Sequence, residues 1–249
     1  MKVKAFKTPI VKRNDDLKDI IKIAVKTVPE KSILVITSKI ISFCQGRIKE
    51  KTSDDREEKH KIAAKEADFY LRSSYSQYNM MLTIKNSTLA VNAGIDESNA
   101  DGSYILWPKD IQKTTNQIWA FLREYYQLEK VGVIVTDSKT IPLRWGVVGT
   151  ALSHCGFKPL HDYRGQKDLF GREMKMSQIN LVEAVAVSAV LEMGEAAERT
   201  PLCLVENINK IKFQDRTPTK KELKELRISP EDDVYSPLLT AVTWLKGKK

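Results

Sequence analysis

Short apolar runs and amphipathic stretches alternate along this chain, and polar or turn-forming residues bound each of them. Apolar runs rich in β-branched residues are typical of strands buried in a sheet. This pattern predicts strands at residues 3–6, 32–37, 131–135 and 202–205. The strand at 131–135 is predicted to end at Thr136-Asp137. Two further runs, 80–85 and 88–91, are separated only by Asn86-Ser87 and predict a hairpin.

Three segments have the apolar spacing of helices. Asp15-Asp16 is placed to cap a helix with the apolar stripe Leu17, Ile20, Ile21, Ile23 and Ala24. Pro108 and Asp110 are predicted in the first turn of a helix with the stripe Ile111, Ile118, Trp119, Leu122 and Tyr125. Residues 181–193 are apolar almost all round and follow Asn180, so this helix is predicted to be buried and capped by that asparagine.

These elements do not follow a strict strand–helix–strand alternation, which predicts an α/β or α+β fold with mixed sheets. Residues 49–66 carry interspersed charges of both signs and predict a solvated helix or loop. At 249 residues, the chain is expected to form a single unit over 1–249, either one large domain or two intimate lobes. The lysine-rich tail from about residue 218 is expected to be peripheral.

Composition and charge add a few limits. With 42% hydrophobic and 29% charged residues, the chain is neither collagenous, nor a disulfide scaffold, nor mostly disordered. The net charge of +9 is compatible with an anionic partner. Three distant cysteines and no signal-like or membrane-spanning apolar run predict a protein of the reducing cytoplasm without membrane contact.

Several familiar signatures of chemistry are missing from the sequence. It contains no GxxxxGK[ST] phosphate loop and no GxGxxG after a strand, which disfavours a P-loop NTPase and a Rossmann dehydrogenase. HExxH and GxSxG are also missing, and His60, His154 and His161 do not have the spacing of a metal triad. His154 and His161 are interpreted as structural or substrate-facing rather than as metal ligands.

Three acidic residues at the ends of predicted elements carry the clearest chemical signal. Asp96 lies in a loop rich in small and polar residues, Asp137 ends a predicted strand, and Glu195 follows the predicted buried helix. Hard divalent cations prefer carboxylate oxygens together with waters and substrate phosphates. The three acids therefore predict a metal site that faces a nucleotide triphosphate, whereas each taken alone is compatible with a helix cap or turn.

Five ordered blocks carry a resemblance to a known family. They are residues 35–42 with Gly46-Arg47, 91–99 (VNAGIDESN), 133–138 (VIVTDS), 162–165 with 168–173 (DYRG and DLFGRE), and 193–195 (MGE). With these blocks the chain resembles the coenzyme F-420-0:gamma-glutamyl ligase family over nearly its full length. The first block resembles that family's first strand and the turn after it.

The resemblance implies a GTP-dependent ligase that joins L-glutamate by an amide bond to the lactyl carboxylate of F-420-0. It implies Mg²⁺ or Mn²⁺, with K⁺ as a further candidate ion, a homodimer, and a fold outside the Rossmann and P-loop classes. The metal ligands of the family map onto Asp96, Asp137, Ser138 and Glu195, of which the three acids would be catalytic. Its nucleotide contacts map onto Thr8, Pro9, Ile10, Val11, Ser38, Lys39, Asn99, Met193, Gly194, Ala196, Ala197, Glu198, Arg199 and Thr200.

Amide formation from a carboxylate explains why such residues are needed. The carboxylate resists attack by an amine, so the expected route passes through an acyl phosphate, and transfer of the phosphoryl group requires charge stabilisation. Cationic side chains beside the motifs are candidate contacts to phosphates or carboxylates, with ordinary surface charge as the alternative: Arg144, Arg164, Lys167 and Arg172.

Two departures from the family pattern leave the acceptor open. Phe43 replaces a lysine that is usual in the family, and an aromatic ring is able to stack on a pterin, so a folate such as tetrahydrofolate is an alternative acceptor. Ala196-Ala197 stands where glycines are usual, and alanine avoids positive φ. A third interpretation is a non-catalytic homologue that binds nucleotide or nucleic acid; the positive charge favours it, and the retained acids argue against it.

Overall fold

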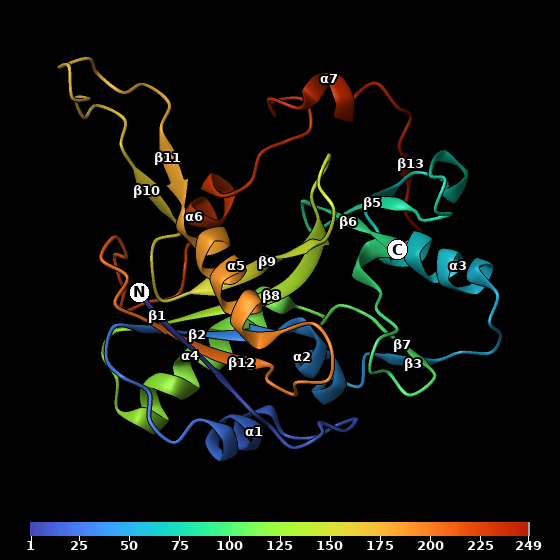
Figure 1. The fold of residues 1–249 in the computed structure, drawn as a ribbon, viewed down its shortest axis with the longest axis horizontal. Coiled ribbons are helices and arrows are strands. Elements are labelled where there is room, and N and C mark those ends of the chain that lie inside the picture. The colour runs from blue at the N-terminus through green and yellow to red at the C-terminus, as the bar shows by residue number, and fades with distance from the viewer. Residues whose placement is uncertain (249) are drawn as a thin grey trace.

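A five-stranded mixed sheet forms the centre of the molecule in a computed structural model that describes residues 1–248 (Figure 1). Its strands, in spatial order, are β1 (Lys2–Phe6), β12 (Leu202–Glu206), β2 (Ser32–Thr37), β8 (Val131–Thr140) and β9 (Val147–Cys155). The pair β2–β8 is parallel, and the other three pairs are antiparallel. The mixed-sheet prediction is confirmed.

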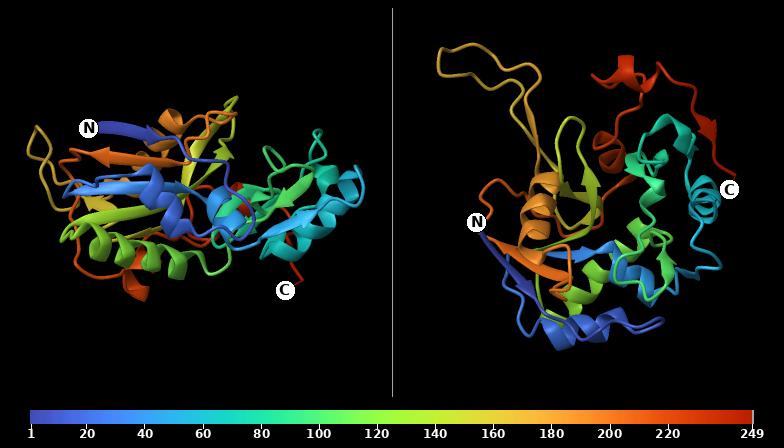
Figure 2. Two further views of the ribbon diagram at one scale, coloured as in Figure 1. Left: turned by 90° about the horizontal axis from the view of Figure 1, so that it is seen from below. Right: turned by 45° about the vertical axis from the view of Figure 1, so that its right-hand side comes forward.

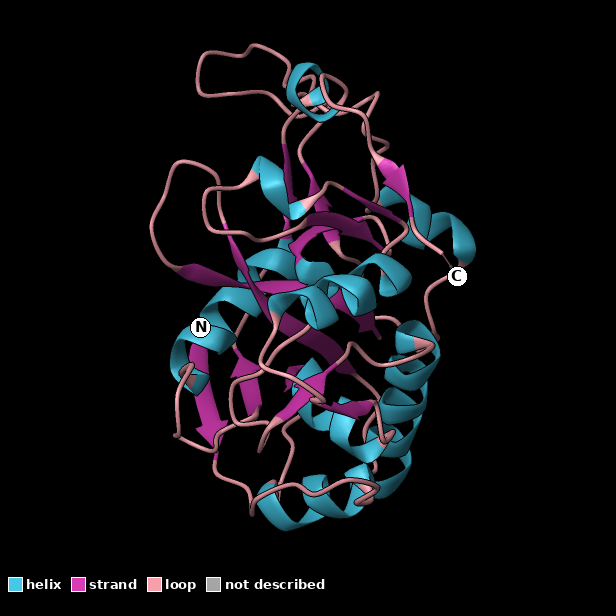
Figure 3. Ribbon diagram, turned by 90° about the vertical axis from the view of Figure 1, so that its right-hand side faces the viewer, coloured by secondary structure: helices cyan, strands magenta, loops and turns pink. Residues whose placement is uncertain are grey.

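Helices cover both faces of this sheet, which explains the apolar runs at residues 33–36, 131–135 and 202–205 in its central strands. The helices on one face are α1 (Leu17–Ala24), α2 (Ser38–Cys44) and α4 (Ile111–Tyr126), whose buried residues share a hydrophobic cluster with Val133 and Val135. The opposite face is covered by α5 (Leu181–Met193), which packs on Ile134 in a second cluster. Figure 3 shows helices packed beside the strands of the central sheet, with the strand next to the N-terminus at the edge.

A second, four-stranded sheet lies beside the central one (Figure 2). Its strands, in spatial order, are β13 (Leu245–Lys246), β4 (Phe69–Tyr70), β5 (Leu82–Lys85) and β6 (Thr88–Val91). Around it lie α3 (Arg56–Glu66), two short 3-10 helices, η1 (Ser73–Tyr75) and η2 (Asn92–Gly94), and the strand pair β3 (Ile48–Glu50) and β7 (Ser103–Ile105). A third hydrophobic cluster, with Ile62 and Ile95, holds this part together.

Two peripheral segments complete the chain. The strands β10 (Leu160–Asp162) and β11 (Gln178–Asn180) form the base of an arm, residues 160–180, whose loop projects from the body (Figure 1). The C-terminal segment contains α6 (Lys220–Glu225) and α7 (Ser236–Leu239) and returns through β13 to pair with β4. No side chain between residues 218 and 248 is buried. Division of the chain into lobes stays a prediction.

Most predicted elements are confirmed, and their caps account for several boundaries. Asp16 accepts a hydrogen bond from the Lys18 backbone N–H at the start of α1, and Asn180 accepts one from the Glu183 N–H at the start of α5. Each satisfies a backbone donor that the first helical turn leaves free. The hairpin β5–β6 also lies where it was predicted.

Two boundaries differ from the prediction. α4 begins at Ile111, so Pro108 and Asp110 precede the helix; Asp110 has a left-handed backbone conformation and ends the preceding loop. The strand predicted to end at Asp137 continues to Thr140, because β9 pairs with it over that stretch. Residues 136–140 are polar, so the pattern of apolar runs did not predict this pairing.

Candidate active site

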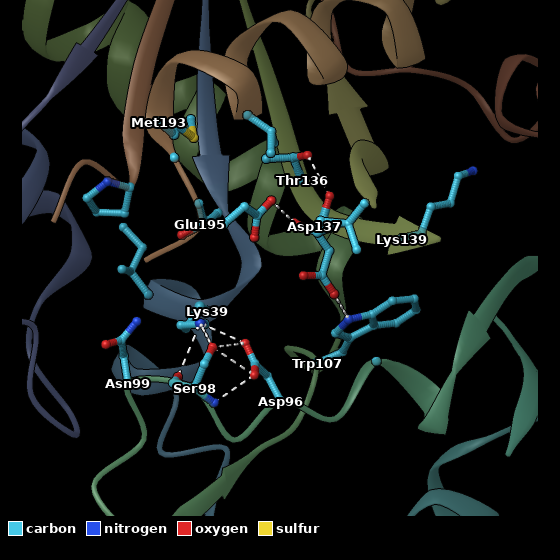
Figure 4. A pocket seen from close by; sticks show the side chains of 18 of the residues that line it. Lys39, Asp96, Ser98, Asn99, Trp107, Thr136, Asp137, Lys139, Met193 and Glu195 are labelled. Atoms are coloured by element: carbon cyan, nitrogen blue, oxygen red, sulfur yellow. Dashed lines mark hydrogen bonds and ion pairs between the residues drawn. The ribbon is translucent and has the colours of Figure 1, made fainter. Parts of the chain in front are cut away.

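A pocket of about 900 Å³ opens where the central sheet meets the four-stranded sheet. Its walls come from the ends of β2 and β8, the edge strand β6, the loop 94–101 and the loop that follows α5. All three acids of the predicted site line this pocket: Asp96, Asp137 and Glu195 (Figure 4). Segments that are far apart in the chain therefore bring the predicted acidic residues to one cavity.

Asp96 is held by a lysine and by its own loop. The Lys39 ammonium lies 2.7 Å from Asp96 Oδ2 and also donates to Ser98 Oγ at 2.9 Å. Backbone N–H groups of Glu97 and Ser98 donate to Asp96 Oδ1. Burial opposes ionisation of Asp96, but the hydrogen bond and charge of Lys39 together with the Ser98 donors hold its pKa below the usual value. Asp96 is therefore an ionised carboxylate with a cation beside it.

Asp137 has a different environment. Burial raises the pKa of Asp137 to about 6, although a hydrogen bond from the Trp107 indole Nε1–H to its Oδ2 acts in the opposite direction. The charge of nearby Asp96 raises this pKa further, and Lys39 lowers it. The two aspartates are thus close enough to interact electrostatically, yet the ordinary hydrogen-bond partner of Asp137 is an uncharged indole.

Ser138 and Glu195 form the third part of the site. Ser138 Oγ donates to Glu195 Oε1 at 2.5 Å, which joins β8 to the loop after α5. Side chains alternate along a strand, so Asp137 belongs to the row of Val133 and Val135, and Ser138 to the row of Ile134 on the opposite face. This alternation directs Asp137 towards Trp107 and Ser138 towards Glu195.

The donor set suits a hard divalent cation, but the side chains are not gathered into a preformed cluster. Carboxylate and hydroxyl oxygens are the ligands that Mg²⁺ and Mn²⁺ prefer. Within residues 1–248, however, no three His, Cys, Asp or Glu side chains lie close enough together to hold a metal ion. Asp137 and Ser138 point to opposite faces of β8, and this keeps Asp137 apart from Glu195, the hydrogen-bond partner of Ser138. Each acid instead has a protein hydrogen-bond donor.

The predicted nucleotide contacts also gather at the pocket, with one exception. The lining residues among them are Thr8, Pro9, Ile10, Val11, Lys39, Asn99, Met193, Gly194, Ala196, Ala197, Glu198, Arg199 and Thr200. Ser38 is buried in the first turn of α2 and does not line the cavity. Two contacts join the segments: Asn99 Nδ2 donates to the Ala196 carbonyl at 2.9 Å, and the Thr8 N–H donates to the Arg199 carbonyl at 2.9 Å.

The predicted substrate contacts divide into two groups. Phe43 on α2 lines the pocket. Arg144, Arg164 and Arg172 do not: Arg144 donates to the neighbouring Leu143 carbonyl, and Arg164 pairs with Asp162 at 2.6 Å on the arm. Lys167 and Arg172 lie in the arm's loop as well. The arm carries Arg164, Lys167 and Arg172 away from the cavity, so their position near the motifs in the sequence did not predict their position in space.

Trp107 is the site residue that sequence reasoning missed. It belongs to none of the motifs and directly precedes Pro108, where a helix was predicted to begin. Its position depends on long-range packing, so no local sequence signal could have placed it against Asp137.

The histidines take no part in the pocket. None of His60, His154 and His161 lines it. His154 on β9 is fully buried beside Phe157, and neither of its ring nitrogens has a hydrogen-bond partner among the described residues. The structural interpretation therefore fits His154.

A comparison with known protein families shows which family this chain belongs to. A sequence model of the family F420-0:Gamma-glutamyl ligase matches residues 5–207. The chain belongs to this family. The matched region contains every acid and every nucleotide-contact candidate of the pocket and stops before the peripheral C-terminal segment.

Two named relatives match nearly the whole chain, and a third matches a smaller part of it. The protein "Coenzyme F420:L-glutamate ligase" of Archaeoglobus fulgidus is 31% identical over 94% of this chain and 96% of its own length. Its namesake from Methanococcus maripaludis strain C7 is 30% identical over 94% and 97%. A third, from Methanopyrus kandleri, is 34% identical over 61% and 60%. The likeness therefore includes the C-terminal part in the first two cases.

No helix within residues 1–248 is long and apolar enough to cross a membrane.

Proposed function

We propose that this protein is a ligase that joins L-glutamate through an amide bond to the carboxylate of coenzyme F420-0, using GTP and a divalent metal ion. Family membership, together with relatives named coenzyme F420:L-glutamate ligase over almost the full chain, carries the proposal. The pocket supports it, because three carboxylates and all but one of the candidate nucleotide-contact residues line one cavity large enough for a nucleotide beside an acceptor.

The reaction needs an activated carboxylate. An oxygen of the acceptor carboxylate attacks the γ-phosphorus of GTP, which forms an acyl phosphate and releases GDP. The amine nitrogen of glutamate then attacks the acyl carbon, loses a proton, and expels inorganic phosphate as the amide bond forms. Both steps are accelerated mainly by positioning and by charge stabilisation, which is the kind of catalysis that a polar pocket provides.

We assign Asp96, Asp137, Ser138 and Glu195 as the residues that would hold Mg²⁺ or Mn²⁺. The bound ion would neutralise phosphate oxygens during transfer. Lys39 already faces this part of the pocket, so its ammonium is available for a phosphate oxygen once Asp96 has another cation beside it. We keep K⁺ as an additional candidate ion.

The loop at residues 193–200 would hold the nucleotide together with Asn99. Gly194 has φ of +77°, a conformation that favours glycine, and a Cβ there would lie 2.5 Å from Glu198 Oε1. The Ala196 N–H donates to Glu198 Oε2, so the loop is closed by its own glutamate where the family usually has glycines. The alanines are compatible with this closed form.

A folate acceptor remains the second candidate because of one observation. Phe43 lines the pocket, where its ring is able to stack on a pterin. A non-catalytic homologue has less support, since all three acids line the cavity.

We also propose a homodimer located in the cytoplasm. On the arm, Leu169 and Phe170 are 98% and 94% exposed, and adjacent exposed apolar side chains are typical of interaction surfaces. Arg164 and Arg172 lie on the same arm and do not line the cavity of their own chain, so we propose that they contact substrate held by the second copy. The three cysteines of the described chain are free thiols, which fits a reducing compartment. Light scattering of the purified protein tests the dimer.

A mass-spectrometric assay tests the reaction. Purified protein is incubated with Mg²⁺, Mn²⁺, GTP and L-glutamate, and F420-0 and tetrahydrofolate are offered separately as acceptors. We expect a gain of one glutamate on F420-0 together with release of GDP and phosphate. Gain on tetrahydrofolate alone would transfer the proposal to the folate acceptor, and gain on neither acceptor would contradict it.

A further inference from the structure

Trp107 donates a hydrogen bond to the Asp137 carboxylate and lies outside β8. Its indole Nε1–H points at Asp137 Oδ2, and the residue is 4% exposed although it lines the pocket (Figure 4). An indole N–H is a donor only, and it has a single direction. It therefore engages one carboxylate oxygen, Oδ2, and Figure 4 shows the other carboxylate oxygen directed away from the indole.

The indole itself is fixed from several directions. Arg47 Nε donates to the Trp107 carbonyl at 3.2 Å, and the Lys85 ammonium lies 5.4 Å from the centre of the ring. Glu66 joins these two cations, at 2.7 Å from Arg47 and 2.8 Å from Lys85. Lys85 is 7% exposed, so this ion-pair network is mostly shielded from water. Such partly buried networks hold their members in one geometry.

Gly94 closes the remaining side. A Cβ built on Gly94 would lie 2.1 Å from Cε2 and Nε1 of Trp107, so the backbone touches the edge of the indole that carries the N–H. A ring held between a backbone, a cation and a hydrogen-bonded main chain cannot turn without displacing them. The direction of its N–H is consequently fixed before any ligand arrives.

We propose that Trp107 is a positioning residue for Asp137: its fixed N–H holds one carboxylate oxygen so that the other faces the metal ion and the nucleotide phosphates. This inference rests on the proposed function, since it assumes that Asp137 is a metal ligand. Side chains that orient a ligating carboxylate typically change metal affinity about 10–100-fold when they are removed.

The test measures equilibrium Mn²⁺ binding by electron paramagnetic resonance, with MnCl₂ alone and with MnCl₂ plus GDP. The variant Trp107→Phe keeps an aromatic ring and removes the N–H. Its matched control is Trp119→Phe, which removes another buried indole N–H, the donor to the Val131 carbonyl at 2.9 Å, away from the pocket. Trp107→Met is the second variant in case the first fails to fold, because methionine adapts to irregular cavities and carries no donor.

We expect Trp107→Phe to weaken Mn²⁺ binding by about 10-fold or more and to lower kcat while the KM for glutamate stays within about twofold. Trp119→Phe should lose thermal stability and retain the Mn²⁺ affinity of the unsubstituted protein. Mn²⁺ affinity of Trp107→Phe, or of Trp107→Met, within twofold of the unsubstituted protein would overturn the role of Trp107 and leave the proposed function standing.

Failure of the proposed function has a separate signature. If the unsubstituted protein does not bind Mn²⁺ with GDP, or if Asp137→Asn binds it equally well, the metal site itself is wrong and the inference about Trp107 is overturned with it.

Discussion

Ser138 Oγ lies 2.5 Å from Glu195 Oε1, and this hydrogen bond ties strand β8 to the loop that would hold the nucleotide. Glu195 enters the pocket immediately after the Gly194 turn that ends α5. The carboxylate is therefore set by a strand hydroxyl on one side and a helix end on the other. A change at either place should alter catalysis more than it alters folding.

Removal of a pocket acid should abolish turnover. We expect Asp96→Ala or Glu195→Ala to reduce kcat by at least about 10²-fold, because loss of one preorganised electrostatic contact commonly costs about 10²–10³-fold. The unfolding temperature should change by only a few degrees, since neither side chain is part of a hydrophobic cluster. Steady-state kinetics and calorimetry check both parts. Turnover that persists in both variants would contradict the assignment of these acids.

Ligands should stabilise the folded protein. With Mg²⁺ and GTP each present at about 100 times its dissociation constant, binding adds about 2.7 kcal/mol per site to the free energy of unfolding. Differential scanning fluorimetry should show a rise of several degrees that disappears when EDTA removes the metal. Equal melting temperatures with and without the ligands would show that the pocket does not bind them.

Lys39 should be needed for turnover. The variant Lys39→Met keeps the length of the side chain and removes the charge that pairs with Asp96. We expect kcat to fall at least about tenfold, because a cation near the transferring phosphoryl group is lost. Lys59→Met serves as a control, since this lysine also borders the pocket but pairs with Glu97. Equal losses in the two variants would mean that the effect is a general loss of positive charge.

His154 should make the protein less stable in acid. Burial lowers the pKa of His154 to about 4, while the unfolded chain titrates near the ordinary value of 6.5. Between these values the unfolded state binds a proton that the folded state does not. The contribution is therefore fully present above pH 6.5, and up to about 3 kcal/mol is lost as the pH falls to 4. Urea unfolding from pH 7 to pH 4 measures it.

A substitution isolates this effect from the titration of carboxylates. His154→Phe should show a smaller decrease in the free energy of unfolding over the same pH range, whereas His161→Gln, on the arm, should follow the unsubstituted protein. Parallel pH curves for His154→Phe and the unsubstituted protein would contradict the assignment.

Gly94 and Gly102 provide a matched pair for the packing around Trp107. Both have φ near +70°, so alanine at either position introduces similar backbone strain, on the order of 1–2 kcal/mol. A Cβ at Gly94 would strike the indole, whereas at Gly102 no atom lies within 4 Å. We expect Gly94→Ala to be clearly less stable than Gly102→Ala in chemical denaturation. Equal destabilisation would show that Trp107 moves away without cost.

The parts of the fold that are visible in the sequence are those set by local pattern. The strand β2 and the helix α5 were predicted correctly because their apolar runs and the Asn180 cap are contiguous signals. The polar half of β8 was missed, since pairing with β9 rather than hydrophobicity holds it. α2 was also missed: its residues continue an apolar strand, and only packing against the sheet reveals the change to a helix.

The residues of the candidate site also divide into those that the sequence indicates and those that it does not. The acids Asp96, Asp137 and Glu195 were found through ordered motifs, and the pocket contains all three. The arginines of the arm were adjacent to motifs in sequence but not in space, because residues 160–180 leave the body of the protein. Trp107 shows the opposite relation: it has no motif and contacts Asp137 across 30 positions of the chain.

The unequal pairing of β8 has a consequence for local stability. Residues 131–136 pair with β2, and most of them also with β9, whereas residues 137–140 pair with β9 alone. Amide hydrogens in the first part should exchange with solvent only when the whole protein unfolds, and those in the second part through smaller local openings. Asp137 and Ser138 stand at the start of this less protected part. The proposed ligands therefore stand where the part of β8 that is paired with β2 ends and the part that is paired with β9 alone begins.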